Sequence, residues 1–486
     1  MALGEVDYGL MGVVGGMVVY ISYLNGLLSS AIGRFYALSV GKQKTDPVTG
    51  LEEGRMWFTT AVVIQSIIPI ALIVVGCPIG EYAVNHWLTI PLDRVTACVW
   101  VWRFVCITCF LNMVTIPFTA MYGAHQYIAE LTIYSFVTTT LNALFLHYMV
   151  THPGIWLAKY AFWTCLLGVV PQLIITVRAY FLFKECRIDP KYFSCFSNVK
   201  KLASYGFWVM WGGLGAMLRG NGQNILINIY YGPRVNSGVA VGTSLSGHCN
   251  TLSGSMIGAF SPAIYNEWGA GNFDKARRLA YQICKLATLF VLVFAIPIIL
   301  EVDEVLLLWL KKPPPYASGI CIFVLVMNII DKTSTGHLAV VNANGKIALY
   351  QAILGTSLVC TLPIGWLLIM LGVGPYSIGW AMVLTMIFCA FGRVWFARTL
   401  VGMSPRYWFK RIVIPIATIA LLALLSGYLP RLFMVQSFMR VCVTSVLVEV
   451  LLIPFSWFLI LEEPERAFLR KRIEPMFVKL RGRVHA

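Results

Sequence analysis

Runs of about 20 apolar residues recur along almost the whole chain of 486 residues. A run of this length spans the hydrocarbon core of a bilayer as an α-helix. Apolar residues make up 58% of the chain and charged residues 12%, with a mean hydropathy of +0.76. Soluble domains carry roughly 45–50% apolar and about 25% charged residues. The sequence therefore predicts an all-α integral membrane protein and excludes a soluble enzyme, a disordered chain and a small secreted module held by disulfides.

The apolar runs predict thirteen membrane-spanning helices. Their expected ranges are 9–33, 56–80, 97–122, 127–150, 157–183, 202–230, 235–262, 279–300, 316–342, 347–371, 375–398, 411–430 and 438–461.

The segments between these helices alternate in charge. One alternate set, which includes the C-terminal tail, holds 25 of the 37 Lys and Arg residues, and the other set holds six. The rich set is 34–55, 184–201, 265–285, 343–346, 398–411 and 462–486. Lys and Arg mark cytoplasmic loops, so we expect a cytoplasmic C-terminus. The net charge of +16 is then a topology signal, and we expect no nucleic-acid partner.

The chain contains an internal repeat. Asn25 begins an 11-residue segment that matches the one beginning at Asn250, 225 positions later, with six identical residues. Ala120 begins a second segment that matches the one beginning at Ala339, at an offset of 219. Matches in the same order with nearly equal offsets indicate a duplication. Parallel repeats of this kind are typical of transporters.

The repeat predicts two homologous six-helix lobes. We expect an N-terminal lobe over 1–184, a cytoplasmic linker over 185–201, a C-terminal lobe over 202–398, and two extra helices with a basic tail over 399–486. The first lobe holds five predicted helices and the second holds six. We therefore expect the first helix of the first lobe to lie before the start of this sequence, as in a fragment or a misplaced start codon. A genuinely shortened variant is the alternative.

Short motifs in both lobes point to one transporter superfamily. In the first lobe they are Asp7-Tyr8-Gly9, Val13–Gly16, Leu24-Asn25-Gly26, Ser29-Ser30-Ala31, Arg34-Phe35 and Gly41-Lys42. In the second lobe they are Asn224–Asn228, Gly232-Pro233, Phe260-Ser261-Pro262, Gly269–Asn272, Ala276-Arg277 and Asn342–Lys346. With these motifs the chain resembles bacterial oligosaccharide flippases of the Wzx type, in the multidrug/oligosaccharidyl-lipid/polysaccharide exporter (MOP) superfamily.

The resemblance implies a fold, a substrate and a location. It implies two lobes around a central cavity that work by alternating access, with two extra C-terminal helices. It implies export of undecaprenyl-pyrophosphate-linked oligosaccharides across the bacterial inner membrane for surface polysaccharide biosynthesis. The expected partners are this lipid-linked substrate, membrane lipids and polysaccharide assembly proteins.

Arg219 is the strongest candidate for substrate binding. An ionisable residue within a span is costly and marks a functional site by default. Arg219 lies about 17 residues into the helix 202–230 and shares a face with Gly215 and Gly222, while Gln223 lies one turn beyond it. A guanidinium binds phosphate in a bidentate manner, so we expect Arg219 and Gln223 to contact a diphosphate in the cavity. The alternative is that Arg219 reaches the outer interface or pairs with a carboxylate, while the glycines permit close packing.

Asp331 is the candidate for ion coupling. It lies inside the predicted helix 316–342 and could couple a proton or a sodium ion, or neutralise Arg219. A simple ion pair is the alternative. Its neighbour Lys332 leaves the helix about 100° away, so we expect only one of the two side chains to face a given site.

Three asparagines complete the candidate substrate site. Asn25 and Asn250 are matched by the repeat, and Asn112 is matched with Asp331 at the offset of 219. Deep in equivalent helices, these amides could contact sugar hydroxyls. Hydrogen bonding between helices is the alternative.

No motif for catalysis or for a cofactor is present. The seven histidines have no ligand spacing, and no phosphate-binding GxxxxGK[ST] loop occurs. We therefore expect no catalytic residue, metal or cofactor, and no enzyme activity. The alternatives to a flippase are a cation-coupled multidrug antiporter of the same superfamily and a membrane-embedded glycan polymerase or ligase. The short outer loops disfavour the latter.

Overall fold

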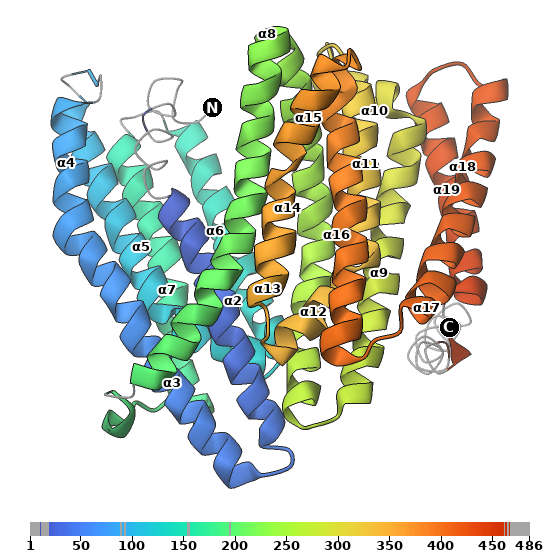
Figure 1. Ribbon diagram of the computed structural model, residues 1–486. Coiled ribbons are helices and arrows are strands. Elements are labelled where there is room, and N and C mark those ends of the chain that lie inside the picture. The colour runs from blue at the N-terminus through green and yellow to red at the C-terminus, as the bar shows by residue number, and fades with distance from the viewer. Residues whose placement is uncertain are drawn as a thin grey trace, which may run out of the picture. The chain divides into compact units, whose positions relative to one another are not determined.

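The computed structural model describes residues 10, 19–87, 90, 91, 94–152, 156–193, 196–460, 462, 463 and 466 (Figure 1). Every regular element in this part of the chain is a helix, so the predicted all-α class is confirmed. Nine of its helices are long and apolar enough to cross a membrane, and the bent pair α11 (Ala317–Thr333) and α12 (Thr335–Asn344) forms a tenth candidate span.

The other three predicted helices lie in two further elements. The helix predicted at 9–33 corresponds to α2 (Val19–Lys42), and most of its first ten residues lie outside the described part of the chain. The single element α8 (Phe196–Gly269) covers the two helices predicted at 202–230 and 235–262. Gly232 separates the two arms of α8 with a φ of 77°, a conformation that glycine adopts without steric cost.

The chain divides into two compact units. The first comprises Met1–Gly213 with Ala259–Ala276, and the second comprises Leu214–Gly258 with Arg277–Ala486. The predicted boundaries of the lobes and of the linker stay predictions.

In the first unit, one central helix is surrounded by its neighbours. It is α5 (Val95–Ala124), which packs against α2, α3 (Pro47–Ala71) and α7 (Leu157–Leu182). The outer elements are η1 (Leu72–Gly76) and α4 (Cys77–His86), which continue α3, together with α6 (Ile128–Thr151) and η2 (Pro190–Tyr192). The core contains Tyr36, Phe58 and Tyr122, all fully buried.

In the second unit, α16 (Ser377–Val401) packs against α11, α12 and α15 (Thr361–Met370) (Figure 1). A second pair of long helices, α18 (Ile414–Phe433) and α19 (Phe438–Leu459), lies side by side at the C-terminal end of the unit. The remaining elements are α9 (Phe273–Leu300), α10 (Val302–Leu310), α13 (Ala348–Tyr350), η3 (Gln351–Gly355), α14 (Thr356–Val359), η4 (Gly374–Tyr376), α17 (Pro405–Trp408) and η5 (Phe409–Val413).

A buried carboxylate joins the two C-terminal helices to the rest of their unit. Glu301, between α9 and α10, is fully buried and accepts hydrogen bonds from Arg440 Nη2 at 2.8 Å and Nε at 3.1 Å. Thr444 Oγ1 donates to the other carboxylate oxygen at 3.3 Å. Because both donors belong to α19, this contact fixes α19 against the α9–α10 junction.

The first arm of α8 passes very close to the segment α13–α15. A Cβ atom added at Gly215 would overlap the backbone carbonyl oxygen of Gly355, and one added at Gly222 would overlap the side chain of Leu362. The two glycines therefore permit the close helix packing that the sequence left as the alternative role for this stripe.

A charged cluster holds together loops of the first unit. The carboxylate of Glu267, near the end of α8, accepts hydrogen bonds from Lys44 Nζ and Lys275 Nζ at 3.0 Å each and from Asn272 Nδ2 at 2.9 Å. Burial alone would raise the pKa of Glu267, but these three donors outweigh it and lower the pKa to about 2. The α2–α3 turn is thereby tied to the end of α8.

Candidate functional site

The break between α11 and α12 gathers polar groups inside a membrane span. The two helices are bent by 45° at Ser334, where the sequence predicts one continuous helix. A break frees backbone carbonyl groups, which need partners inside a membrane. Arg393 Nη1 lies 3.2 Å from the carbonyl oxygen of Asp331, and Trp408 Nε1 donates to that of Thr333 at 2.8 Å. Thr335 Oγ1 also donates to the carbonyl oxygen of Asp331, at 3.0 Å, so local and long-range donors together satisfy the carbonyl groups at the break.

The carboxylate of Asp331 binds two cations at this break. Arg393 Nη1 lies 2.7 Å from Oδ1 of Asp331, and Lys332 Nζ lies 2.8 Å from Oδ2. Ser334 Oγ is a further acceptor for Arg393 at 3.2 Å. All three charged side chains are largely shielded, with exposed fractions of 18% for Asp331, 13% for Arg393 and 7% for Lys332.

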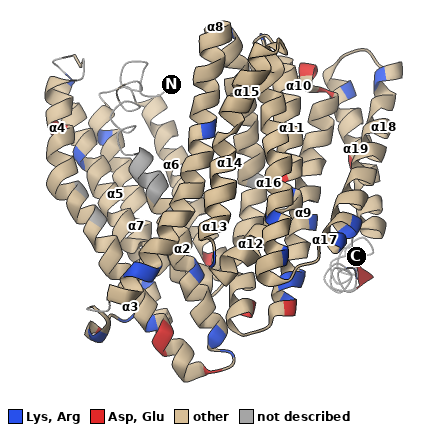
Figure 2. Ribbon diagram, viewed as in Figure 1, with Lys and Arg blue, Asp and Glu red and all other residues tan. Residues whose placement is uncertain are grey.

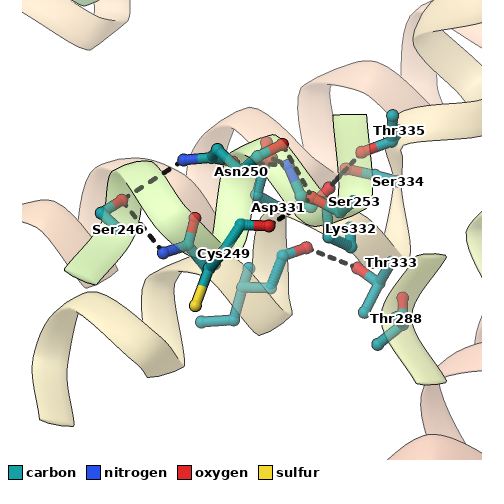
Figure 3. A network of polar contacts seen from close by, with 12 residues as sticks. Ser246, Cys249, Asn250, Ser253, Thr288, Asp331, Lys332, Thr333, Ser334 and Thr335 are labelled. Carbon is teal, nitrogen blue, oxygen red and sulfur yellow. Dashed lines mark hydrogen bonds and ion pairs between the residues drawn. The ribbon is translucent and has the colours of Figure 1, made fainter. Parts of the chain in front are cut away.

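The expectation that only one of Asp331 and Lys332 faces a given site is wrong. The side chains leave the helix in different directions, but the long, flexible stem of Lys332 brings its ammonium group back to the carboxylate. Figure 3 shows the two side chains meeting at the end of α11.

The second arm of α8 contributes amide and hydroxyl groups to the same network (Figure 3). Lys332 Nζ donates to Oδ1 of Asn250 at 2.8 Å, and Nδ2 of Asn250 lies 3.3 Å from Ser246 Oγ. Asn328 Nδ2 also donates to Ser246 Oγ, at 3.1 Å. The structure thus brings together Asn250 and Asp331, two of the predicted site residues, through Lys332.

Arg219 lies within electrostatic range of this network but outside its hydrogen bonds. The charges of Asp331 and Arg393 both act on its guanidinium. Its Nη1 is buried and has no hydrogen-bond partner among the described residues. One turn further along α8, Nε2 of the buried Gln223 is also without a partner there. Buried N–H donors are normally paired, so two unpaired donors one turn apart mark a site for an acceptor.

The predicted residues of the first unit form a neutral counterpart. Asn25 on α2 is 8% exposed, and its Oδ1 has no partner among the described residues. Oδ1 of Asn112 on α5 is likewise buried and unpaired in that part of the chain, while its backbone oxygen accepts from Thr115 Oγ1 at 3.2 Å. No hydrogen bond joins Asn25 to Asn112 within the described ranges.

Sequence reasoning missed two residues of this kind. Arg393 lies inside the predicted helix 375–398, so the same rule that selected Arg219 could have selected it. Gln65 in the first unit is 1% exposed, and neither atom of its amide group has a partner among the described residues. Gln65 lies inside the predicted helix 56–80. A neutral amide there indicates a functional site less strongly than a charged side chain does.

The site in the second unit carries an excess of positive charge. Arg219, Lys332 and Arg393 face a single carboxylate, Asp331, so these four groups have a formal charge of +2. No group of three or more His, Cys, Asp or Glu residues that could hold a metal occurs in the part of the chain that the structure describes. The arrangement is suited to an anionic ligand that offers oxygen acceptors.

Known structures with the same fold are transporters. The chain superposes on a MATE protein in complex with MaL6 with a TM-score of 0.65 and 16% identity, covering 82% of this chain and 91% of that one. It superposes on a MOP superfamily transporter from Pyrococcus furiosus, described as having a binding pocket of reverse polarity, with a TM-score of 0.64 and 15% identity, covering 82% and 90%. The chain has the fold of MATE transporters.

A third known structure has the same fold. It is an outward-facing multidrug resistance MATE family transporter of the MOP superfamily, with a TM-score of 0.64 and 15% identity, covering 82% of this chain and 89% of that one. No protein-family model and no curated protein matches the sequence. The comparisons with solved structures thus show a MATE-like fold with two lobes.

Proposed function

We propose that this MATE-like protein is a flippase for lipid-linked oligosaccharides whose lipid carries a diphosphate. The observation that supports the proposal is the pair of buried donors at Arg219 and Gln223, which have no partner among the described residues, in a group whose formal charge with Asp331, Lys332 and Arg393 is +2. A diphosphate supplies several anionic oxygen acceptors close together. A guanidinium binds two of them at once, and such charge-assisted hydrogen bonds are about twice as strong as neutral ones.

The candidate amides of each unit suit the sugar part of such a substrate. Asn250 lies at the edge of the charged network, and Asn25 and Asn112 are the buried amides at the positions matched by the repeat. Amides both donate and accept hydrogen bonds, as sugar hydroxyl groups require. We propose that they contact the oligosaccharide during alternating access.

A cation-coupled multidrug antiporter is the rival within the same fold. An exporter of cations needs a carboxylate that is free to bind a proton, a metal ion or the drug. Asp331 instead binds Lys332 and Arg393, both within 2.8 Å of its oxygens. One neighbour with this fold is described as having a binding pocket of reverse polarity and a different function. That description supports our use of the charge of the binding site to distinguish between functions of proteins with this fold.

The proposal includes an orientation and a location. The 25 Lys and Arg residues on one set of segments support a cytoplasmic C-terminus, and the resemblance to oligosaccharide flippases supports the bacterial inner membrane. Lipid-linked substrate would then enter from the cytoplasmic leaflet, and polysaccharide assembly proteins would act on it after transport. A fluorescent protein fused to the C-terminus, which is bright only in the cytoplasm, tests this orientation.

Transport by the purified full chain in liposomes tests the function. We expect it to move a fluorescent polyprenyl-diphosphate oligosaccharide between leaflets and to leave a cationic dye untransported under proton and sodium gradients. Protein-free liposomes provide the background rate. Gradient-driven transport of the dye without movement of the lipid-linked oligosaccharide would establish the antiporter instead.

A further inference from the structure

A groove of about 530 Å³ lies between the C-terminal end of α16 and the turn formed by α17 and η5. Its walls include the aromatic side chains of Phe391, Trp395, Trp408 and Phe409. All of its lining residues belong to the second unit. Neither the proposed transport site nor the repeat motifs use this groove.

The aromatic wall continues an apolar face of α16. Trp380, Leu384, Phe388, Phe391 and Trp395 are exposed on this helix at intervals of three or four residues, so they lie on one side of it. A membrane-spanning helix turns such a face toward hydrocarbon. The open side of the groove therefore meets lipid rather than water.

Three positively charged side chains line the same groove. Arg398 at the end of α16, Arg406 in α17 and Lys410 in η5 line it, and all three are exposed. No carboxylate in the described part of the chain forms an ion pair with any of them. Figure 2 shows positive residues beside α17. They lie in the segment 398–411, which the charge pattern assigns to the cytoplasmic side.

We propose that this groove binds an anionic phospholipid of the cytoplasmic leaflet. Its phosphate lies against Arg398, Arg406 and Lys410, and an acyl chain packs on Phe391 and Trp395. Basic pockets between helices on the cytoplasmic side bind anionic headgroups by this combination of charge and apolar contact. A lipid without net charge fills the apolar wall equally well but gains less from the three cations.

The groove also includes a residue that stabilises the break between α11 and α12. Trp408 forms part of the groove and donates its indole N–H to the carbonyl oxygen of Thr333, at the end of α11. Trp408 is 4% exposed and packs in the core of the second unit, so it forms the floor of the groove and a bound lipid adds to contacts that the fold already makes. Binding of the lipid should therefore raise the thermal stability of the protein.

Thermal unfolding of the delipidated full chain in detergent tests the proposal. Phosphatidylglycerol should raise the unfolding temperature of the wild type more than phosphatidylcholine does. The variant with Arg398→Gln, Arg406→Gln and Lys410→Gln should bind phosphatidylglycerol about a hundred-fold more weakly, since each lost cation costs roughly five-fold. The control, Lys200→Gln with Lys201→Gln and Lys346→Gln, removes three exposed charges from the same predicted side and should respond as the wild type does.

Two results would overturn the proposal. One is an equal gain in stability with the two phospholipids, or the same gain in the groove variant as in the control. The other is stabilisation by a polyprenyl diphosphate through the three cations with no effect of phosphatidylglycerol, which would assign the groove to the transport substrate.

A second measurement avoids any effect of the charge variants on folding. Phosphatidylglycerol with brominated acyl chains quenches tryptophan fluorescence only on contact. The fraction quenched in the wild type should fall in Trp395→Phe and stay unchanged in Trp457→Phe. Equal quenching in the wild type and in Trp395→Phe would show that no lipid occupies the groove.

Discussion

Individual charges inside the second unit depend on one another. The carboxylate of Asp331 forms ion pairs with both Lys332 and Arg393. The backbone carbonyl oxygen of Asp331 also accepts a hydrogen bond from Arg393. Burying a charge costs several kcal/mol unless a partner and hydrogen bonds compensate it. The network therefore explains how two cations can remain beside a broken span without access to bulk water.

Removal of the shared carboxylate should destabilise the protein strongly. Asp331→Asn leaves Lys332 and Arg393 without a counter-charge, and the loss of one partner of a buried pair costs about 3–5 kcal/mol. Chemical or thermal unfolding in detergent measures the change. Glu52→Gln removes an exposed carboxylate and should change stability by less than about 0.5 kcal/mol. Equal stability of the two variants would contradict the role given to the network.

The cluster around Glu267 should make stability depend on pH. The pKa of this carboxyl group is lowered from 4.5 to about 2, so it stays ionised in the folded state at pH values that protonate it in the unfolded state. Its contribution is complete above a pH of about 5 and is lost as the pH falls toward about 2. The difference in the free energy of unfolding between the wild type and Glu267→Gln should therefore decrease as the pH falls through this range. A difference that stays unchanged from pH 7 to pH 3 would show that ionisation of Glu267 contributes nothing to stability.

At the scale of helices, the spacing between α8 and the segment α13–α15 depends on glycine. A side chain at Gly215 would meet the backbone of Gly355, which cannot move aside as a flexible side chain can. Gly220, on the same arm of α8, has no atom within 4 Å of the position that a Cβ would take. The two positions thus separate a packing requirement from a general effect of glycine in a helix.

Alanine substitutions should have opposite effects at these two positions. Gly215→Ala should destabilise the protein by about 1–3 kcal/mol because it forces α8 away from Gly355. Gly220→Ala should be neutral or stabilising by up to about 1 kcal/mol, since alanine favours a helix. Unfolding temperatures of the two variants provide the measurement. Similar destabilisation by both would mean that the close approach at Gly215 is not what holds the helices together.

The helices were predictable from sequence because hydrocarbon imposes a minimum length on each apolar span. The break at Ser334 was not. Thr333 and Ser334 are compatible with a helix, and the donors that replace the lost bonds, Arg393 and Trp408, lie 62 and 75 positions from the groups they bind. Local periodicity carries no information about such partners.

The candidate site was predictable only in part, for a related reason. The cost of ionisable groups in a membrane identified Arg219 and Asp331, and the internal repeat identified Asn250. It could not indicate that Asp331 binds Arg393, or that Lys332 links Asp331 to Asn250. Which charges pair depends on the packing of helices that are distant in sequence.

At the scale of the whole molecule, the two units differ in the polar side chains of their candidate sites. The first unit contains neutral amides at Asn25, Gln65 and Asn112, and the second contains the charged network. The candidate positions of the second unit are thus suited to phosphate, and those of the first unit to neutral hydrogen-bonding groups. We therefore expect the second unit to decide which headgroups are transported.

The proposed binding of the anionic headgroup by Arg219 is tested by the rate at which Arg219→Gln flips a polyprenyl-diphosphate oligosaccharide in liposomes. A charge-assisted hydrogen bond is worth about 1.5–3 kcal/mol, so the variant should be about 10 to 100 times slower than the wild type. Lys159→Gln, which removes a cation from the first unit, provides the control and should retain the full rate. Flipping by Arg219→Gln at the wild-type rate, with equal amounts of folded protein, would contradict the claim.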